Sequence, residues 1–339
     1  MNYSKSMLIS TPDSRQTTIA EPGHRNLEAL VGVSESVGVR QQSLSIVIPA
    51  RNEAAGLAQL LPALAQALPG AEIIVSDDGS TDDTAAVAES LGARVFSRPY
   101  GAGNGAAIKA GARVATGDLI VFMDGDGQHR AQDVLRLLSE FGKGYDMVVG
   151  ERNSKGQANL HRGWANSFYN RLASWMVGRK VGDLTSGFRV VRASRFREFL
   201  YLLPNGFSYP TTSTMAFFRA GYTVAYVPIE VQSRMAGTQS HIRLWRDGLR
   251  FLLIIFKIGT LYSPLKLFAP VSMAFFAAGL ANYAKTYFTE GRFTNMSVLM
   301  FSASVIVFLI GLISEQITAL MYKDTDNGQP QPPRQRPTE

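Results

Sequence analysis

The 339-residue chain has no cysteine. This excludes a disulfide scaffold, a thiolate zinc site, an iron–sulfur cluster and a cysteine nucleophile. Histidine is scarce as well, and the four histidines are not spaced as a metal site. Any bound metal is therefore expected to have oxygen ligands. The first twenty residues also lack an apolar run like the core of a signal peptide, so no cleavage or secretion is expected.

The formal net charge is +7, from 34 basic and 27 acidic side chains. A positive sum is typical of proteins that bind nucleic acid or an anionic membrane surface. The charges are unevenly distributed, however. Residues 43–146 have 13 acidic and 8 basic side chains, a net charge of −5, whereas residues 147–240 have 4 acidic and 12 basic side chains, a net charge of +8. An acidic half followed by a basic half argues against a nucleic-acid binder.

Short apolar segments alternate with helical patterns from Leu44 onward. The apolar runs predict strands over 44–48, 72–75, 94–96, 119–123 and 146–149, with helices over 54–68, 81–91, 106–116 and 133–141. This alternation is typical of an α/β domain with a mostly parallel sheet flanked by helices. Residues 1–42 show no apolar periodicity and are expected to form a flexible N-terminal arm.

Two charge-free apolar runs, 267–284 and 296–314, follow in the C-terminal third. Each is near the lower length limit for crossing a bilayer, so they predict two transmembrane helices. Two buried core helices are the alternative. Two spans place both chain ends on one side of the membrane. The basic residues Arg250, Lys257 and Lys266 before the first run predict that this side is the cytoplasm, with the protein multi-pass in the cytoplasmic (inner) membrane.

The segment just before the first run, 241–257, has the pattern of an amphipathic helix. At 100° per residue its basic side chains lie on one face and its large apolar side chains on another. The basic set is Arg243, Arg246, Arg250 and Lys257, and the apolar set is Trp245, Leu249, Leu252 and Phe256. This pattern predicts a helix on an anionic membrane surface, and a solvated face on a soluble helix is the alternative.

Two carboxylate clusters follow predicted strands in the acidic half. The first contains Asp77 and Asp78, and the second contains Asp124 and Asp126. Because ligands collect beyond the carboxyl ends of strands in open parallel sheets, the two clusters are expected to meet at one site. The closely spaced Asp124 and Asp126 suit a Mg²⁺ or Mn²⁺ ion that bridges the phosphates of a nucleotide diphosphate.

The basic half contains arginines and hydroxyl side chains in glycine-containing loops, a combination typical of phosphate recognition. These are Arg152, Ser186, Arg189 and Arg234. The loop 101–106 (GAGNGA) loosely matches a dinucleotide fingerprint, but it does not follow the first strand, so a loop that flanks the donor phosphates or a plain helix entry is favoured. Lys109, just downstream, is expected to face a diphosphate. His129 remains open as a general base, a metal neighbour or a structural residue.

Five motifs in this order resemble glycosyltransferase family 2. They are residues 48–53 (IPARNE), 77–82 (DDGSTD), 124–129 (DGDGQH), 150–152 (GER) and 183–189 (DLTSGFR). The resemblance is to the polyprenyl-phosphate branch of the family, which is similar to dolichyl-phosphate-mannose synthase, and it covers about residues 43–245. It implies a GT-A nucleotide-sugar-binding fold. The family's Arg-x-x-Gly-x-Ser-Lys element appears here, from Arg234 to His241, with one extra residue and with His in place of Lys.

The resemblance implies roles for individual residues. Pro49, Glu53, Asp77 and Asp78 are expected to line the nucleotide pocket, with Lys109 near the diphosphate. Asp124, Asp126 and Gln128 are expected to hold the metal. Arg152, Ser186, Arg189 and Arg234 are expected to bind the acceptor phosphate. Asp124, Asp126, Arg152 and Arg189 are expected to carry the reaction.

The sequence thus predicts a membrane-bound inverting glycosyltransferase that moves a hexose or related sugar from a nucleotide-diphosphate sugar to a polyprenyl phosphate. Two alternatives remain open: a transferase with a saccharide or lipid hydroxyl acceptor, and a non-catalytic lipid-phosphate-binding membrane protein. The expected partners include the lipid bilayer and a second copy of the chain, and exclude nucleic acid. The expected parts are the arm 1–42, the catalytic domain 43–240, the surface helix 241–263, the transmembrane pair 264–321 and a disordered tail 322–339.

Overall fold

The computed structural model describes residues 42–152, 160–206, 209–230, 256–257 and 259–322. Almost all of the expected arm and tail, most of the expected surface helix, and Arg234 and His241 lie outside these residues. The described chain from Ser43 onward belongs to one compact unit.

A seven-stranded mixed sheet forms the centre of the domain, in the order β3-β2-β1-β4-β6-β5-β7. Its strands are β1 (Leu44–Ala50), β2 (Glu72–Asp77), β3 (Arg94–Ser97), β4 (Leu119–Phe122), β5 (Met147–Arg152), β6 (Arg189–Arg192) and β7 (Val224–Ile229). Strand β6 is antiparallel to β4 and β5, and the other pairs are parallel. The expected mostly parallel α/β sheet is confirmed. Strand β6 was not predicted. Its four residues include no turn residue, so nothing in this segment indicates a strand of reversed direction.

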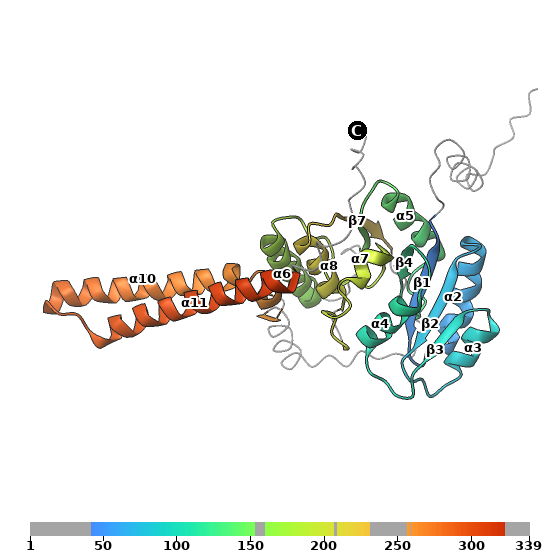
Figure 1. Cartoon of the computed structure of the whole chain (residues 1–339), viewed down its shortest axis with the longest axis horizontal. Helices are drawn as coiled ribbons and strands as arrows, with labels where there is room; N and C mark the ends of the chain where they lie inside the picture. The colour runs from blue at the N-terminus through green and yellow to red at the C-terminus, as the bar shows by residue number, and fades with distance from the viewer. Residues whose placement is uncertain (1–41, 153–159, 207–208, 231–255, 258, 323–339) are drawn as a thin grey trace, which may run out of the picture. The chain divides into compact units, whose positions relative to one another are not determined.

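Helices cover both faces of the sheet (Figure 1). One face packs against α2 (Ala54–Ala67), α3 (Thr84–Ser90) and α5 (Ala131–Phe141). The other packs against α4 (Asn104–Val114), α6 (Leu160–Val177), α7 (Ala193–Arg197) and α8 (Tyr209–Arg219). A hydrophobic core therefore lies on each face of the sheet. Side chains alternate between the two faces along a strand, so in β1 Ile46 and Ile48 face the first helix layer and Val47 faces the second. Helix α3 begins at Thr84 rather than at the expected Thr81, since Asp82 and Asp83 form the preceding turn.

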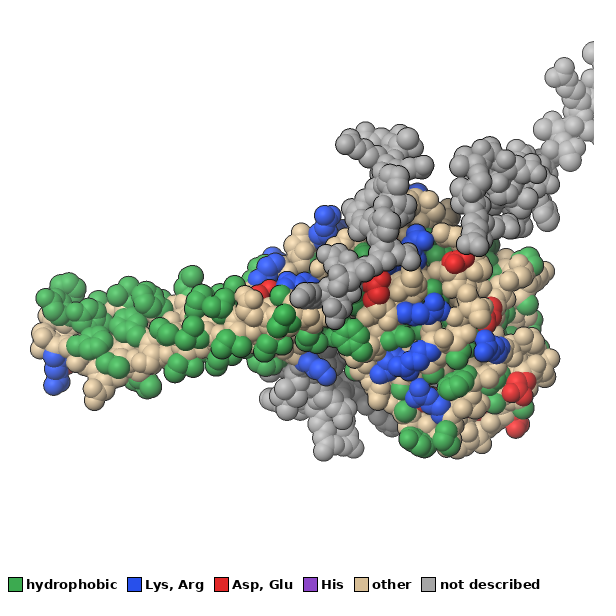
Figure 2. Space-filling model, viewed as in Figure 1, with side chains coloured by type: hydrophobic (Ala, Val, Ile, Leu, Met, Phe, Trp, Pro, Cys, Tyr) green, Lys and Arg blue, Asp and Glu red, His purple; other side chains and the backbone are tan. Residues whose placement is uncertain are grey.

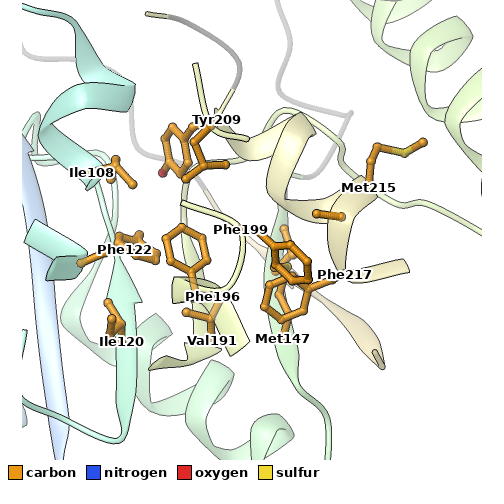
Figure 3. Packing of buried hydrophobic residues seen from close by; sticks show 14 of the residues in the cluster. Ile108, Ile120, Phe122, Met147, Val191, Phe196, Phe199, Tyr209, Met215 and Phe217 are labelled. Atoms are coloured by element: carbon orange, nitrogen blue, oxygen red, sulfur yellow. The ribbon is translucent and has the colours of Figure 1, made fainter. Parts of the chain in front are cut away.

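The second layer is rich in aromatic side chains (Figure 3). Phe122 of β4 packs against Phe196 of α7, with ring centroids 4.6 Å apart, and against Tyr209 of α8 at 6.3 Å. Aromatic pairs at these separations add to the stabilisation from area burial. This packing places the first residue of α8 over the end of β4, where the carboxylate cluster begins.

Two long apolar helices, α10 (Pro264–Glu290) and α11 (Asn295–Tyr322), form an antiparallel hairpin (Figure 1). Both are candidate membrane spans, and each is about 40 Å long at 1.5 Å per residue, enough to cross a hydrocarbon core of about 30 Å. The seam between the helices has small and polar residues, including Gly279 against Phe301, and Ser272 hydrogen-bonded to Ser304 at 2.9 Å. The outward surface is predominantly hydrophobic (Figure 2).

Candidate active site

A cavity of about 480 Å³ opens at the carboxyl ends of β1, β4 and β5. The strand order reverses direction around β1, whose neighbours are β2 and β4, and such switch points are where open α/β sheets bind ligands. The cavity is lined by Pro49, Ala50, Arg51, Glu53, Asp78, Gly103, Asn104, Ala107, Asp124, Asp126, Gln128, His129, Arg152, Thr185, Ser186, Gly187, Tyr209 and Pro210. The structure therefore brings together most of the predicted site residues from both the acidic and the basic halves.

The acidic wall of the cavity is the turn after β4. Asp124, Asp126 and Gln128 are all half-buried along it, and the backbone N–H of Gln128 donates to the Asp126 carboxylate at 3.2 Å. Gly125 packs closely between the two aspartates: a Cβ there would lie 2.4 Å from the Glu53 carboxylate and would displace that side chain. The short sequence spacing of the two carboxylates is thus preserved as a local turn packed on the end of β1.

This wall has the chemistry of a hard-cation site. Among the described residues, no group of three or more His, Cys, Asp or Glu side chains is arranged to hold a metal ion. Two carboxylates and an amide oxygen nevertheless fit Mg²⁺ or Mn²⁺, since such ions are commonly held by one or two carboxylates and complete their coordination with substrate phosphates and water. Asp124, Asp126 and Gln128 are the residues that would hold such an ion.

Asp78 holds the loop beside the nucleotide end of the cavity. Its two carboxylate oxygens accept backbone N–H bonds from Ala102 at 2.8 Å and Gly103 at 2.7 Å. The neighbouring Asp77 does not line the cavity. It is 4% exposed and accepts the N–H of Ser80 at 3.0 Å, so it shapes the turn after β2. Asp77 was expected to contact the nucleotide, but in this structure it has a structural role in the turn.

Arg152 lies at the end of β5 on the basic wall and is held by Asp183. Its Nε and Nη2 donate to the two Asp183 oxygens at 2.7 and 3.0 Å, and Nη2 also donates to the Thr185 hydroxyl at 2.5 Å. Burial alone would lower the pKa of Arg152, but the hydrogen bonds and attraction of Asp183 raise it above its ordinary value. A permanently charged and preoriented guanidinium therefore faces the cavity.

Arg189 is not on the cavity surface, contrary to expectation. Its side chain is 0% exposed and donates to Pro210 O at 3.1 Å, to the Ser213 hydroxyl at 2.7 Å, to the Thr214 hydroxyl at 3.1 Å and to Ser186 O. These acceptors compensate a buried charge that would otherwise be costly. Arg189 therefore joins the Ser186 loop to the first turn of α8 and does not line the cavity.

Lys109 is also absent from the cavity lining. Its ammonium donates to Leu203 O at 3.0 Å and bonds to the Asn205 side chain. The glycine-rich loop before it meets the same segment: Gly105 N donates to Gly206 O at 3.1 Å, and a Cβ on Gly105 would lie 2.1 Å from Pro204 O. The loop and Lys109 thus bind the 203–206 backbone, and the expected contact of Lys109 with a diphosphate is corrected.

His129 lines the cavity with its ring stacked on Phe188, at a centroid distance of 4.6 Å. It is 8% exposed, and burial lowers the pKa of its imidazole despite the nearby Asp126 carboxylate. Its Nδ1 has no hydrogen-bond partner among the described residues. The imidazole, packed on an aromatic ring, forms part of the cavity wall.

Two family models match the chain: glycosyl transferase family 2 over residues 45–200, and the GtrB C-terminal hairpin over residues 263–320. An undecaprenyl-phosphate mannosyltransferase of Micrococcus luteus is 31% identical over 208 residues, which cover 56% of this chain and 84% of the relative. The chain belongs to glycosyltransferase family 2. The expected family is therefore confirmed, and the chain is a glycosyltransferase.

Other members of glycosyltransferase family 2 agree with this assignment. A dolichyl-phosphate hexose transferase of Haloferax volcanii is 29% identical, covering 58% of this chain and 86% of that relative. The structure of glucosyl-3-phosphoglycerate synthase from Mycobacterium tuberculosis, in complex with Mn²⁺, UDP and glucosyl-3-phosphoglycerate, has a TM-score of 0.53 at 23% identity and covers 71% of this chain and 85% of that one. This likeness confirms the GT-A fold.

Several lining residues of this glycosyltransferase were not predicted as site residues. Tyr209 is buried, its hydroxyl donates to Gly187 O at 3.0 Å, and burial raises the pKa of its phenol. Arg51 and Thr185 also line the cavity. Both residues lie within family motifs, Arg51 in 48–53 and Thr185 in 183–189, so membership of a motif could have identified them as site residues. Tyr209 lies in no motif and reaches the site only because α8 packs on β4 and α7.

Proposed function

We propose that this protein transfers a sugar from a nucleotide-diphosphate sugar to a polyprenyl phosphate at the cytoplasmic face of a membrane. The observation that carries the proposal is a single cavity with the Asp124–Asp126 turn on one wall and the anchored Arg152 on the other, in a chain that also has two apolar helices long enough to span a bilayer. The names of the relatives, an undecaprenyl-phosphate mannosyltransferase and a dolichyl-phosphate hexose transferase, support the same acceptor class.

The donor occupies the acidic end of the cavity. Pro49, Glu53 and the loop held by Asp78 would bound the nucleoside, and Asp124, Asp126 and Gln128 are the residues that would hold Mg²⁺ or Mn²⁺. When bound, such an ion neutralises the charge that develops on a diphosphate leaving group. Two nearby carboxylates without a cation would repel a diphosphate, so donor binding depends on the ion.

The acceptor phosphate occupies the basic end. The Arg152 guanidinium orients it through charge-assisted hydrogen bonds, and Ser186, whose hydroxyl has no hydrogen-bond partner among the described residues, lies beside it. A phosphate monoester has its second pKa near about 6 and is largely a dianion at neutral pH. It is therefore already a nucleophile and needs orientation more than deprotonation.

The reaction is an in-line displacement at the anomeric carbon with inversion. An oxygen of the lipid phosphate forms the new bond to C1 of the sugar as the bond from C1 to the diphosphate oxygen breaks, and the electron pair leaves with the nucleoside diphosphate. Arg152 would orient the attacking phosphate at one end of the reacting line, and a divalent cation held by the Asp124–Asp126 turn would offset the charge that develops on the leaving diphosphate at the other end, so no proton transfer is needed. A hydroxyl acceptor would need a general base, whereas the described residues beside Arg152, namely Thr185, Ser186 and Gly187, suit an anionic acceptor that needs none.

In this proposal the α10–α11 hairpin lies in the cytoplasmic membrane with both of its ends on the cytoplasmic side. Basic residues around the start of α10, including Lys257 and Lys266, outnumber those in the short turn between the helices, where Arg292 lies, and this supports the orientation. The active site then faces the leaflet in which cytoplasmic polyprenyl phosphate and soluble nucleotide sugars meet.

Product analysis tests this function. Purified full-length protein with Mn²⁺, undecaprenyl phosphate and a panel of labelled nucleotide sugars is expected to yield one labelled lipid, identified by mass spectrometry as the polyprenyl-phosphate sugar. The same panel identifies the sugar and the nucleotide. Failure with every donor, together with transfer to a saccharide or lipid hydroxyl, would overturn the proposal.

A further inference from the structure

Helix α8 extends from the candidate active site to the base of the α10–α11 hairpin. Its first two residues, Tyr209 and Pro210, line the cavity, and its last residue, Arg219, contacts α11. Every residue from Tyr209 to Phe217 is buried. A helix packed along its whole length moves as a rigid body, so its two ends are mechanically coupled.

The cavity end of α8 is bound tightly to the acceptor wall. Tyr209 donates its hydroxyl to Gly187 O at 3.0 Å. Arg189 contributes bonds to Pro210 O and to the hydroxyl of Ser213, while its other amino group donates to Ser186 O. The loop that presents Ser186 to the cavity is therefore positioned by the first turns of α8.

The opposite end of α8 is bound to the hairpin. Arg219 Nη2 lies 2.7 Å from Glu315 Oε1 on α11, and the second Glu315 oxygen accepts the Leu265 N–H in the first turn of α10 at 3.3 Å. Tyr262, which is 1% exposed just before α10, donates its hydroxyl to Thr212 O of α8 at 2.8 Å. Glu315 thus joins both hairpin helices to α8.

Glu315 is an unusual residue for its position. It is the only charged residue in the 28 residues of α11, which otherwise has the composition of a membrane span. It directly follows the charge-free run 296–314 and lies about two turns from the C-terminal end of α11, so it stands where the apolar span ends. The pair is partly buried, with the two side chains 31% and 26% exposed, so it is less screened than a surface pair.

We infer that Arg219 and Glu315 are a positioning pair that sets the orientation of the acceptor wall relative to the bilayer. The inference rests on the proposed function. A polyprenyl phosphate is held in the membrane, so its phosphate lies at a nearly fixed depth and reaches Arg152 and Ser186 only if the cavity is held at the matching height and tilt. A soluble acceptor is free of this constraint, because it enters the cavity in any orientation.

The test uses full-length protein in lipid nanodiscs and two acceptors: membrane-embedded undecaprenyl phosphate and water-soluble geranyl phosphate. Arg219→Glu and Glu315→Arg are each expected to raise the KM for the embedded acceptor about tenfold, the scale of losing one close charge pair. The KM for geranyl phosphate and for the nucleotide sugar should stay within about twofold. The double variant Arg219→Glu with Glu315→Arg re-forms the ion pair, though not the bond from the Leu265 N–H, and is expected to recover a large part of the increase in KM for undecaprenyl phosphate.

Two further variants make the experiment specific. Glu315→Gln keeps the size of the side chain and should raise the same KM less than the charge reversal does. Arg94→Glu is the control. It reverses the charge of Arg94, which pairs with Glu72 at 3.1 Å, and should leave the KM for both acceptors unchanged. Equal KM changes for the two acceptors, no change for either, or failure of the double variant to recover would overturn the inference alone. Absence of lipid product from the wild type would overturn the proposed function and the inference together.

Discussion

Side chains around the cavity divide into those that face its interior and those that hold other side chains in place. Asp124, Asp126 and Arg152 belong to the first group. Asp183 and Arg189 belong to the second, since both are buried and their bonds go to neighbouring residues. A substitution of Asp124 or Asp126 should change kinetics at nearly constant stability, whereas one of Asp183, of Arg189, or of Arg152, which pairs with Asp183, should change stability as well.

Asp126→Ala is expected to reduce kcat by about a hundredfold or more, because removal of a preorganised electrostatic contact at a developing charge has effects of this size. The measurement is nucleoside diphosphate release at saturating donor and acceptor. Glu89→Ala, which removes an exposed carboxylate on α3, serves as the matched control and should keep wild-type turnover. A normal kcat in Asp126→Ala would contradict the assignment of this turn to the reaction.

The Asp183–Arg152 pair predicts a pH dependence of stability. Burial raises the pKa of Asp183, but the hydrogen bonds and attraction of Arg152 outweigh burial and leave that pKa below its ordinary value of 3.8. A depressed carboxylate pKa stabilises the fold above the unfolded-state value, and the stabilisation is lost as pH falls through the folded value. The wild-type Tm should therefore fall below about pH 4 in part through this group.

Thermal unfolding of Asp183→Asn between pH 3 and 7 checks this expectation. The variant should have a lower Tm at pH 7, because the partly buried Arg152 loses its charged partner, and a weaker dependence of Tm on pH in the acid range. Glu89→Gln should follow the wild-type profile. Parallel pH profiles for Asp183→Asn and the wild type would show that the pair does not contribute in this way.

The α10–α11 hairpin is held by close backbone approach and by polar contacts between the helices. Gly279 would place a Cβ 3.1 Å from the Phe301 ring and 3.2 Å from Met300 Cβ, and Asn282 donates to the Ser297 hydroxyl at 3.0 Å. In lipid, small residues and interhelical hydrogen bonds of this kind drive helix association, since the surrounding tails are as apolar as leucine.

Gly279→Leu is expected to separate the helices and lower the Tm in detergent micelles, even though leucine favours a helix by about 1 kcal/mol relative to glycine. Ala278→Leu, at the adjacent and exposed position, makes a similar addition on the outward face and should leave the Tm nearly unchanged. The comparison separates packing between the helices from a general effect of bulk. Equal shifts for the two variants would argue against a close-packed seam.

The absence of cysteine makes the orientation of the whole protein directly measurable. Single cysteines at Arg292, in the turn between α10 and α11, and at Glu89, on the catalytic domain, report the two sides. If the domain lies in the cytoplasm, a membrane-impermeant maleimide should label Arg292→Cys in intact spheroplasts. Glu89→Cys should react only after permeabilisation. Labelling of Glu89→Cys in intact spheroplasts would reverse the proposed orientation.

Local patterns were enough to predict strands β1 to β5, helices α2 to α5 and the turn that carries Asp124 and Asp126, but not β6, β7 or helices α6 to α8. The strand 119–123 followed by Asp124 and Asp126 is continuous in sequence, so a buried strand and the turn after it determine where the carboxylates lie. Arg189 and Lys109 were misassigned for the opposite reason. Their partners, Pro210 and Ser213 for Arg189 and Leu203 for Lys109, are distant in sequence, and an arginine that binds phosphate has the same local signature as one that binds carbonyl groups.

Composition and order in the chain established the class of this protein: an α/β domain with oxygen-ligand chemistry, followed by two apolar helices. These properties depend on periodicity and on motifs of a few residues, which are local. Tertiary packing determined which charges face the cavity, because burial and hydrogen bonding to remote backbone groups turn Asp77, Lys109 and Arg189 away from it. The +7 net charge and the missing cysteine limited the possible chemistry. The position of α8 between the cavity and the hairpin depends instead on contacts between residues far apart in the sequence, such as Arg219 and Glu315.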